Sequence, residues 1–159
     1  MSKSLHRVTA ALARAGLAIT PLEMPGDTRT AAQAAAAAGC ALDQIAKSII
    51  MAGASSGQAL LFLTAGGNQV DPARAAALAG EPLTRADAAL IRAQTGFAIG
   101  GVAPIGHLSP IRAFLDPRLL DFAQVWAAAG TPRHIFPIAP QDLLRITGAQ
   151  TGNFTTLGT

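Results

Sequence analysis

The segment Thr95–His107 constrains this chain more than any other part of its sequence. It reads Thr-Gly-Phe-Ala-Ile-Gly-Gly-Val-Ala-Pro-Ile-Gly-His, with four glycines and one proline among apolar residues. A regular strand would not tolerate that density of glycine, because glycine loses more backbone freedom on folding than any other residue. The segment therefore predicts a sharply turning loop, stiffened by Pro104, whose bare backbone N–H and C=O groups approach a ligand. Two tight turns between strands are the alternative interpretation.

Lys47 lies in a second informative segment, Gln44–Met51. If this segment is a strand, period-two alternation places Lys47 on one face with Ile45, Ile49 and Met51. An ammonium on an apolar face is costly unless it is paired or reaches into a cleft. We therefore expect Lys47 to project from a sheet into a pocket, where it meets a phosphate or polarises a carbonyl. A lysine that protects an edge strand from aggregation is the alternative.

The length and composition set limits on the class of protein. The chain has 159 residues, half of them apolar, and we expect one domain spanning residues 1–159. Its longest nearly apolar run is too short to cross a bilayer, and its start lacks the apolar region of a signal peptide. The single cysteine, Cys40, excludes an intrachain disulfide. These features favour a cytoplasmic protein with no membrane partner.

The charge balance is consistent with contacts to phosphate. Twelve Lys and Arg against nine Asp and Glu give a net charge of +3, and only Lys3 and Lys47 among the basic residues are lysine. Arginine pairs with phosphate through two hydrogen bonds at once, so an arginine-rich surface suits nucleic acid. The excess is small and there is no basic run, so any footprint on nucleic acid would be small too.

Turn residues and apolar periodicity divide the chain into short helices and strands. We expect helices after Ser4 as far as Gly16, over Ala31–Ala38 after Thr28 or Thr30, from Asp71-Pro72 to Gly80, from Thr84 through Gln94, and from Pro140. We expect strands over Leu17–Glu23, Ile45–Met51, Ala59–Thr64, Arg112–Leu115 and Arg133–Ile138, and residues Leu119–Ala129 are ambiguous. Hairpins and interspersed helices without a strict βαβ repeat indicate an α+β domain with a curled, largely antiparallel or mixed sheet.

Several of these segments together resemble a known family. The residues Ile45-Ala-Lys47-Ser-Ile, the strand Leu60–Thr64, the helices after Asp71 and the Thr95–His107 loop are similar to those of YbaK-type aminoacyl-tRNA deacylases. These trans-editing proteins are related to the editing domain inserted in bacterial prolyl-tRNA synthetases. The resemblance spans roughly residues 20–150. It implies a barrel-like, curled sheet surrounded by helices.

The resemblance also implies an activity and a site. The activity would be hydrolysis of the ester between a wrong, small amino acid and the 3′-terminal adenosine of a tRNA, often the tRNA for proline, largely assisted by the substrate itself. Lys47 would hold the acceptor end, and Gly100 to Pro104 would line the amino-acid pocket and place the ester. The expected catalytic residues are Lys47, Gly100, Gly101 and His107. The expected substrate-binding residues are Val102, Ala103, Pro104, Gly106, Phe97, Ser48, Thr64 and His134.

Other motifs of catalysis do not occur in the sequence. There is no Gly-x-Ser-x-Gly elbow, no metal-ligand spacing of His or Cys, and no phosphate-binding glycine motif ending in Lys-Ser/Thr. We therefore expect neither a metal nor a cofactor. Two alternatives stay open, a non-catalytic module that binds the tRNA acceptor end beside a synthetase, and a small nucleotide binder. The residues leave undecided which amino acid and which tRNA are used, and whether the chain forms oligomers.

Overall fold

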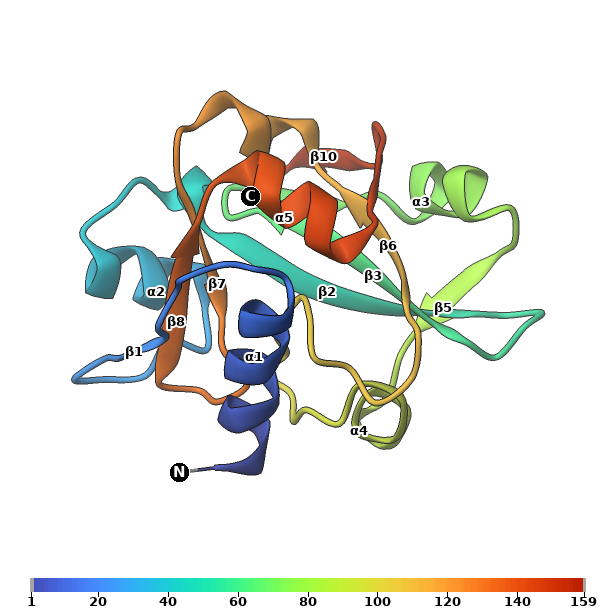
Figure 1. Cartoon of the computed structure of the whole chain (residues 1–159). Helices are drawn as coiled ribbons and strands as arrows, with labels where there is room; N and C mark the ends of the chain where they lie inside the picture. Colours follow the sequence, from blue (N-terminus) through green and yellow to red (C-terminus); the bar gives the residue numbers. More distant parts are fainter. Residues whose placement is uncertain (1, 159) are drawn as a thin grey trace.

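A computed structural model describes residues 2–158 of the chain. These residues form short helices and strands wrapped around one long hairpin (Figure 1). The helices are α1 (Lys3–Arg14), α2 (Ala31–Ala38), η1 (Leu42–Gln44), α3 (Pro72–Ala79), α4 (Ala88–Thr95), η2 (Pro117–Asp121) and α5 (Pro140–Thr147), where η marks a 3₁₀ helix. The strands are β1 (Leu22–Glu23), β2 (Ala46–Gly53), β3 (Ala59–Ala65), β4 (Asn68–Val70), β5 (Leu83–Arg85), β6 (Arg112–Leu115), β7 (Val125–Ala128), β8 (His134–Ile138), β9 (Gln150–Thr151) and β10 (Thr155–Leu157).

The strands make three sheets. The largest has the order β5-β2-β3-β6-β9, a second has the order β1-β8-β7, and β10 pairs with β4. In the largest sheet β2 is antiparallel to β3 and β5, whereas β3–β6 and β6–β9 are parallel pairs. The α+β class and the mixed sheet are therefore confirmed, but the sheet does not close into a barrel.

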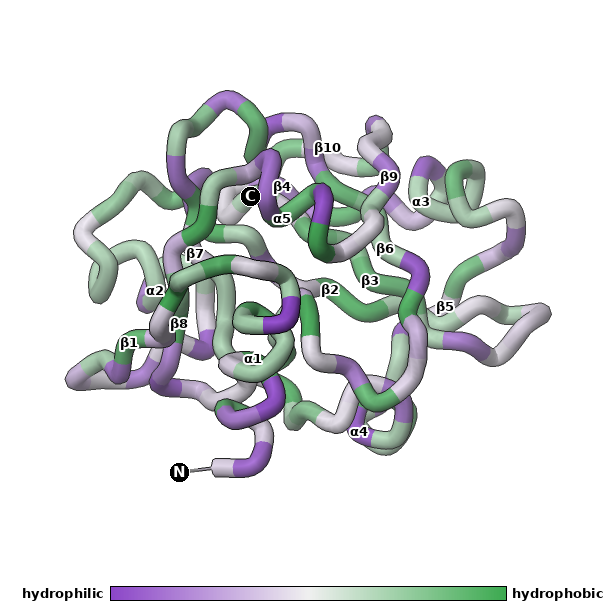
Figure 2. The backbone as a smooth tube through the Cα atoms, viewed as in Figure 1, coloured by the Kyte–Doolittle hydropathy of each residue, from purple (hydrophilic) through white to green (hydrophobic). Residues whose placement is uncertain are grey.

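The core lies on both faces of the large sheet, which explains why every residue of β3 is buried. Leu61, Leu63 and Leu115 face the larger core, which also contains Val8 and Leu12 of α1. The opposite face carries a smaller core of Leu60, Phe62, Ala75, Ala79, Phe114 and Phe154. Hydrophobic colour accordingly gathers along β2 and β3 inside the molecule in Figure 2.

Several elements lie where the sequence predicted them, and for two helices the caps explain why. Thr30 and Gln33 form a capping box at the start of α2, and Asp71 caps α3 in front of Pro72. Strands β2, β3, β6 and β8 and helix α5 also lie where we expected them.

Three boundaries were wrong, and one ambiguous segment is now assigned. Helix α1 is capped by Ser2 instead of Ser4, and α4 begins after Asp87 because Leu83–Arg85, including Thr84, pairs with the end of β2. Of Leu17–Glu23 only Leu22–Glu23 forms a strand; Pro21, which has no N–H to donate, directly precedes it. The ambiguous Leu119–Ala129 divides between η2 and β7.

Within residues 2–158, no helix combines the length and the apolar character that a membrane span requires.

Phe154 generates a prediction about stability. It is fully buried, and its ring lies edge-on to Phe62 with centroids 5.0 Å apart, so it fastens the C-terminal segment to the smaller core. We expect Phe154→Ala to lower the free energy of unfolding by about 3–5 kcal/mol. Urea denaturation measures this loss. Leu157→Ala removes a side chain that is 83% exposed and should change the value by less than about 0.5 kcal/mol. Equal effects of the two variants would contradict the assignment.

Candidate functional site

A cavity of about 460 Å³ lies beside β2. Cavities that bind small molecules usually span about 300–1,000 Å³, so this one has a suitable size. Its walls come from residues 28–34, β2, the loop after α4, and the second sheet. The lining residues are Thr28, Arg29, Thr30, Ala31, Ala34, Ile45, Ala46, Lys47, Ser48, Ile49, Ile50, Ile91, Ile99, Gly100, Val102, Trp126, Ala127, Ala128 and Ile135.

The cavity follows the edge of β2 that faces away from β3. At one end of this edge Ile45 forms a bridge with Trp126, and at the other end β5 pairs with Met51–Gly53. Between these points, among the described residues, no strand is paired with that edge. An unpaired edge presents backbone N–H and C=O groups. The wall of the cavity along residues 46–50 therefore offers backbone hydrogen bonds to a ligand.

Ser48 is the unusual polar residue of this wall. Its hydroxyl is buried, and it is the one buried side-chain polar atom of residues 2–158 that lacks a hydrogen-bond partner. A buried polar group without a partner costs about 1–3 kcal/mol. Ser48 lines the cavity, and its hydroxyl has a hydrogen-bonding capacity that no described residue uses.

Lys47 lies on the other face of β2. It pairs with Thr64, while Ile49 pairs with Phe62 and Met51 with Leu60, so the predicted face shared by Lys47, Ile49 and Met51 is confirmed. The half-buried side chain lines the cavity, and its ammonium donates a hydrogen bond to the carbonyl of Asn68 in β4. Burial lowers the pKa of Lys47 below its ordinary value, and the charges of Asp116 and Asp43 act in the opposite direction.

The glycine-rich loop reaches the same cavity from the side of the larger core. Gly100 and Val102 line the cavity, and Gly100 has a φ of +93°, a backbone conformation that favours glycine. A Cβ atom on Gly100 would lie 3.1 Å from Cγ of Arg29, so the stem of that arginine covers the loop. Gly101 packs against backbone instead, because a Cβ there would lie 2.8 Å from the carbonyl carbon of Thr131.

The backbone amides of the loop differ in their availability. The amide of Gly101 donates to the carbonyl of Ala98 at 3.1 Å and is therefore already occupied. The amides of Gly100 and Val102 have no partner among the described residues. These two remain as donors toward the cavity.

Arg7 of α1 holds the loop from behind. Its guanidinium donates to the carbonyl of Gly96 at 2.8 Å and to that of Gly106 at 3.2 Å, and it lies 4.7 Å from the ring centroid of Phe97. Both ends of the loop are therefore fastened to one side chain. This contact could not be predicted from the sequence, because no local pattern links Arg7 to residues 89 and 99 positions away.

The second half of the loop turns away from the cavity. Pro104, Gly106 and His107 line a separate, more open hollow between α1 and α5, and Ala103 and Phe97 are fully buried. The Nε2 atom of His107 lies 2.7 Å from the carbonyl oxygen of Ala103. The structure therefore favours a role for His107 in shaping the turn, and it does not bring these five residues together with Lys47.

Two further predicted residues also lie outside the cavity lining. Thr64 is fully buried, and its hydroxyl donates to the carbonyl of Phe62 at 3.0 Å. His134 lies at the start of β8, where its Nδ1 atom is 2.6 Å from the hydroxyl of Thr131. Thr131 is the residue whose backbone packs on Gly101, so His134 acts on the loop only indirectly.

Two walls of the cavity were not predicted from the sequence. One is formed by Thr28, Arg29 and Thr30, and the other by Trp126. The first segment was interpreted only as a helix cap. For the wall at Trp126, the sequence did offer a signal, because this residue is the only tryptophan and lies between two predicted strands. Aromatic side chains often line binding sites, and in the structure Trp126 is half-buried.

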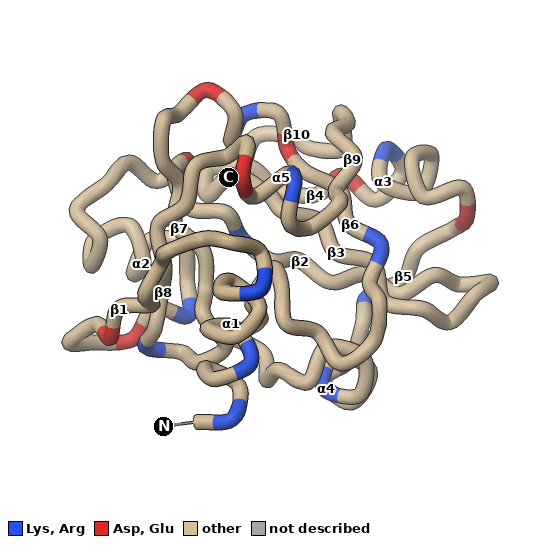
Figure 3. Tube along the Cα trace, in the orientation of Figure 1, with Lys and Arg blue, Asp and Glu red and all other residues tan. Residues whose placement is uncertain are grey.

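Positive charge predominates near the loop. The side chain of Arg29 is 59% exposed and has only a long contact, 3.9 Å, with Asp27. Helix α1 contains three residues that are Lys or Arg and none that is Asp or Glu, so in Figure 3 its tube has blue segments and no red one. No residue of the cavity lining is His, Cys, Asp or Glu, and nowhere in residues 2–158 do three or more such residues gather in a way that could hold a metal ion.

Comparisons with known proteins agree with one another. Residues 25–146 match a family model described as the aminoacyl-tRNA editing domain. A protein of Bacillus subtilis (strain 168), named only as uncharacterized protein YwhH, is 30% identical over 121 residues, which are 76% of each chain.

Solved structures are also similar. One is described as a candidate trans-editing enzyme for prolyl tRNA synthetase; it is 44% identical, has a TM-score of 0.91, and the match covers 98% of this chain and 99% of that one. Another, described as a hypothetical protein, is 27% identical with a TM-score of 0.87, and the match covers 94% and 99% of the two chains.

His107 generates a prediction about pH. Burial lowers the pKa of its imidazole and the charge of Arg7 lowers it further, while the contact with Ala103 opposes both. The folded chain therefore binds this proton less readily than the unfolded chain. The stability contributed by the neutral imidazole is complete above about pH 6.5 and is lost as the pH falls below that value.

The urea midpoint, followed by the fluorescence of Trp126, should therefore decrease from about pH 7.5 to about pH 5.5. We expect a smaller decrease in His107→Gln than in wild type. His6→Gln, a change at an exposed histidine, should retain the full decrease. If His107→Gln and wild type respond to pH alike, the burial of this imidazole has no effect on stability.

Proposed function

The chain belongs to the aminoacyl-tRNA editing domain family, and from that premise we propose that it deacylates mischarged tRNA. The reaction is hydrolysis of the ester between a small amino acid and the 3′-terminal adenosine. The oxygen of water forms a bond to the ester carbonyl carbon and the bond from that carbon to the ribose oxygen breaks. One proton of the water goes to the ribose oxygen, and the remaining OH becomes part of the carboxyl group of the amino acid. The products are a free amino acid and an uncharged tRNA.

One observation carries the proposal. A single cavity is lined by the lysine of β2, by Ser48, whose buried hydroxyl has no partner, and by the glycine-rich loop. A positive charge, a free hydrogen-bonding group and free backbone amides are what an aminoacylated RNA end requires. In our assignment Lys47 holds a phosphate of the acceptor end, as the family resemblance implies, and Arg29 adds a second positive charge at the rim.

The lining of the cavity favours a mechanism assisted by the substrate. None of the lining residues has an imidazole, a thiol or a carboxylate, and Lys47 is assigned to the acceptor end, so this assignment leaves no lining residue as a general base. An aminoacyl ester is already reactive, and a hydroxyl of the ribose can assist the attack. The amides of Gly100 and Val102 would stabilise the oxyanion, and one such donor contributes roughly 3–4 kcal/mol to the transition state.

The apolar walls suit a small side chain. Ala31, Ala34 and Val102 line the cavity together with the aromatic ring of Trp126. A pocket of fixed size separates side chains that differ by one methylene by about 1–3 kcal/mol, so neighbouring small amino acids would overlap as substrates. The relative described as a candidate trans-editing enzyme for prolyl tRNA synthetase makes tRNA for proline the first tRNA to test. A synthetase partner and action in the cytoplasm, where tRNA is charged, belong to the same proposal.

Lys47→Ala tests the assignment of the lysine. A hydrogen bond to a charged group contributes about 1.5–3 kcal/mol, so we expect kcat/KM for deacylation to fall by roughly 10- to 150-fold. The measurement is release of amino acid from a panel of tRNAs charged with alanine, serine, cysteine or threonine. Lys3→Ala removes the only other lysine and should leave release unchanged. Protection of the ester by the wild-type protein would instead identify a non-catalytic binding module.

Ser48→Ala separates a ligand contact from a structural one. Removing a buried hydroxyl that has no partner should raise the free energy of unfolding by about 1 kcal/mol. Loss of its bond to the substrate should at the same time lower kcat/KM by about tenfold. Thermal denaturation and the deacylation assay measure the two effects. Ser55→Ala, in the exposed turn after β2, should change neither. A Ser48→Ala variant with full activity would remove Ser48 from the site.

A further inference from the structure

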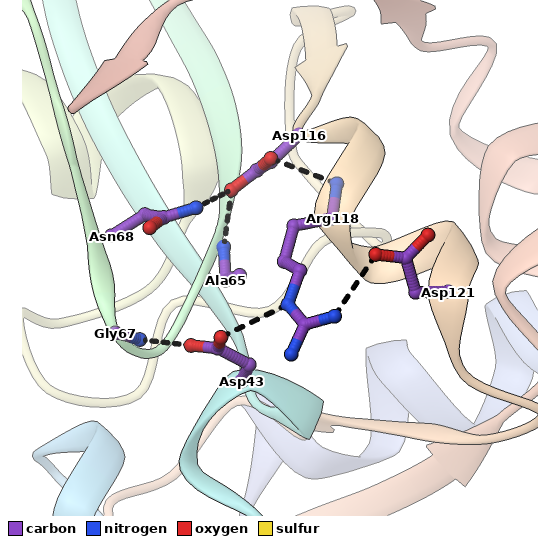
Figure 4. A network of polar contacts seen from close by, with 7 residues as sticks. All are labelled: Asp43, Ala65, Gly67, Asn68, Asp116, Arg118 and Asp121. Carbon is purple, nitrogen blue, oxygen red and sulfur yellow. Dashed lines mark hydrogen bonds and ion pairs between the residues drawn. The ribbon is translucent and has the colours of Figure 1, made fainter. Parts of the chain in front are cut away.

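The turn between β3 and β4 is held by a buried carboxylate. Asp116, which follows β6, is 2% exposed. Its Oδ2 atom accepts hydrogen bonds from the side-chain amide of Asn68 at 2.9 Å and from the backbone amide of Ala65 at 3.1 Å. Its Oδ1 atom accepts one from the backbone amide of Arg118 at 3.0 Å. Figure 4 shows Asp116 joining the turn to the start of η2 through these contacts.

A second carboxylate supports the same turn from η1. Asp43 accepts a hydrogen bond from the backbone amide of Gly67 at 2.7 Å and one from the guanidinium of Arg118 at 3.0 Å. Arg118 also donates to Asp121 at 2.9 Å (Figure 4). The residues of the turn are thus bonded to two aspartates that come from different parts of the chain.

This turn supplies the group that holds Lys47. The carbonyl of Asn68 accepts the hydrogen bond of the Lys47 ammonium, and the side chain of the same Asn68 is bonded to Asp116. No ion pair joins either aspartate to Lys47 among the described residues, and both carboxylates accept hydrogen bonds from other donors. The ammonium therefore rests on a neutral oxygen, which competes less strongly with an incoming phosphate than a carboxylate would.

We propose that Asp116 and Asp43 are positioning residues of the editing site, which keep the Lys47 ammonium charged and seated on the β3–β4 turn, ready to meet the acceptor end. The inference rests on the proposed function for the role of Lys47. Its structural part, the dependence of the Lys47 ammonium on the two aspartates, can be tested without any tRNA.

The charges around Lys47 support the proposal independently of the turn. Burial lowers the pKa of Lys47, and Asp116 and Asp43 are the groups that oppose this effect. The other charged neighbours of the turn are Arg118, which is bonded to Asp43 and Asp121, and Asp121 itself, which is exposed. Removing the charge of Asp116 should therefore lower the pKa of Lys47 further and increase the fraction of neutral amine.

The amine content of the chain makes this measurable. Lys47 and Lys3 are the only lysines, so labelling by acetic anhydride, followed by mass spectrometry of peptides, reports each amine separately. We expect Asp116→Asn to increase the rate of Lys47 labelling near neutral pH by about three- to tenfold, because a lower pKa leaves more of the amine neutral. Lys3 should be labelled at the wild-type rate.

Asp121→Asn is the matched control. It removes a carboxylate bound to the same Arg118 but with no bond to the turn, so Lys47 labelling should not change. Asp43→Asn alters a partly exposed carboxylate and should act in the same direction as Asp116→Asn, with a smaller increase; it also tests the proposal if Asp116→Asn does not fold. The proposal is overturned if the folded Asp116→Asn or Asp43→Asn protein labels at the wild-type rate, or if Asp121→Asn has the same effect.

Deacylation provides the functional readout. Because Lys47 would lose its proton at lower pH, the alkaline decline of kcat/KM should move to lower pH in Asp116→Asn, with the larger change in KM, and Asp121→Asn should retain the wild-type profile. A purely structural role would lower activity equally at every pH. If labelling responds as expected while even the wild-type protein releases no amino acid, the positioning of Lys47 stands and the proposed function fails.

Discussion

In the β2–β3 hairpin, Lys47 pairs with Thr64 and Ser48 pairs with Leu63, and the arrangement of the site depends on this register. Side chains of a strand alternate between its faces, so a shift of one residue would exchange Lys47 and Ser48. The buried residues of β3 fix the register, because Phe62 must reach the smaller core while Leu61 and Leu63 reach the larger one. The core therefore determines which polar group faces which part of the cavity.

The cavity exists because β2 and β7 separate after their first contact. β2 and β7 meet at Ile45 and Trp126 and then separate, and β5 reaches only the far end of β2. The glycine-rich loop and residues 28–34 enclose the space that remains. The lining residues come from α2, from β7 and β8 of the second sheet, and from β2 of the large sheet, so the site lies where separately packed parts of the fold meet. Figure 1 shows α2 beside β7 and β8.

Much of the fold could be predicted from local sequence signals. The cap Asp71-Pro72, the capping box at Thr30 and the apolar runs of β2 and β3 each specify their element within a few residues. Thr84 and Asp87 are both good caps, and only the pairing of Leu83–Arg85 with β2 decides between them. Strand β4 was missed because its partner, Thr155–Leu157, lies far away in the sequence.

The site could be predicted only in part. Ser48, Lys47, Gly100 and Val102 do line one cavity, because strand alternation and the turning loop are local properties. The direction of His107 depends on a bond to Ala103 and on the position of α1, and neither can be inferred from neighbouring residues.

The contact of Arg7 with both ends of the loop has a wider consequence. Arg7 belongs to α1, which lies outside residues 25–146, the part of the chain shared with the family model. The walls along β2 and β7 lie within the shared part, whereas this fastening of the loop does not. A substitution in the N-terminal helix can therefore change how freely the loop moves while every residue that lines the cavity stays the same.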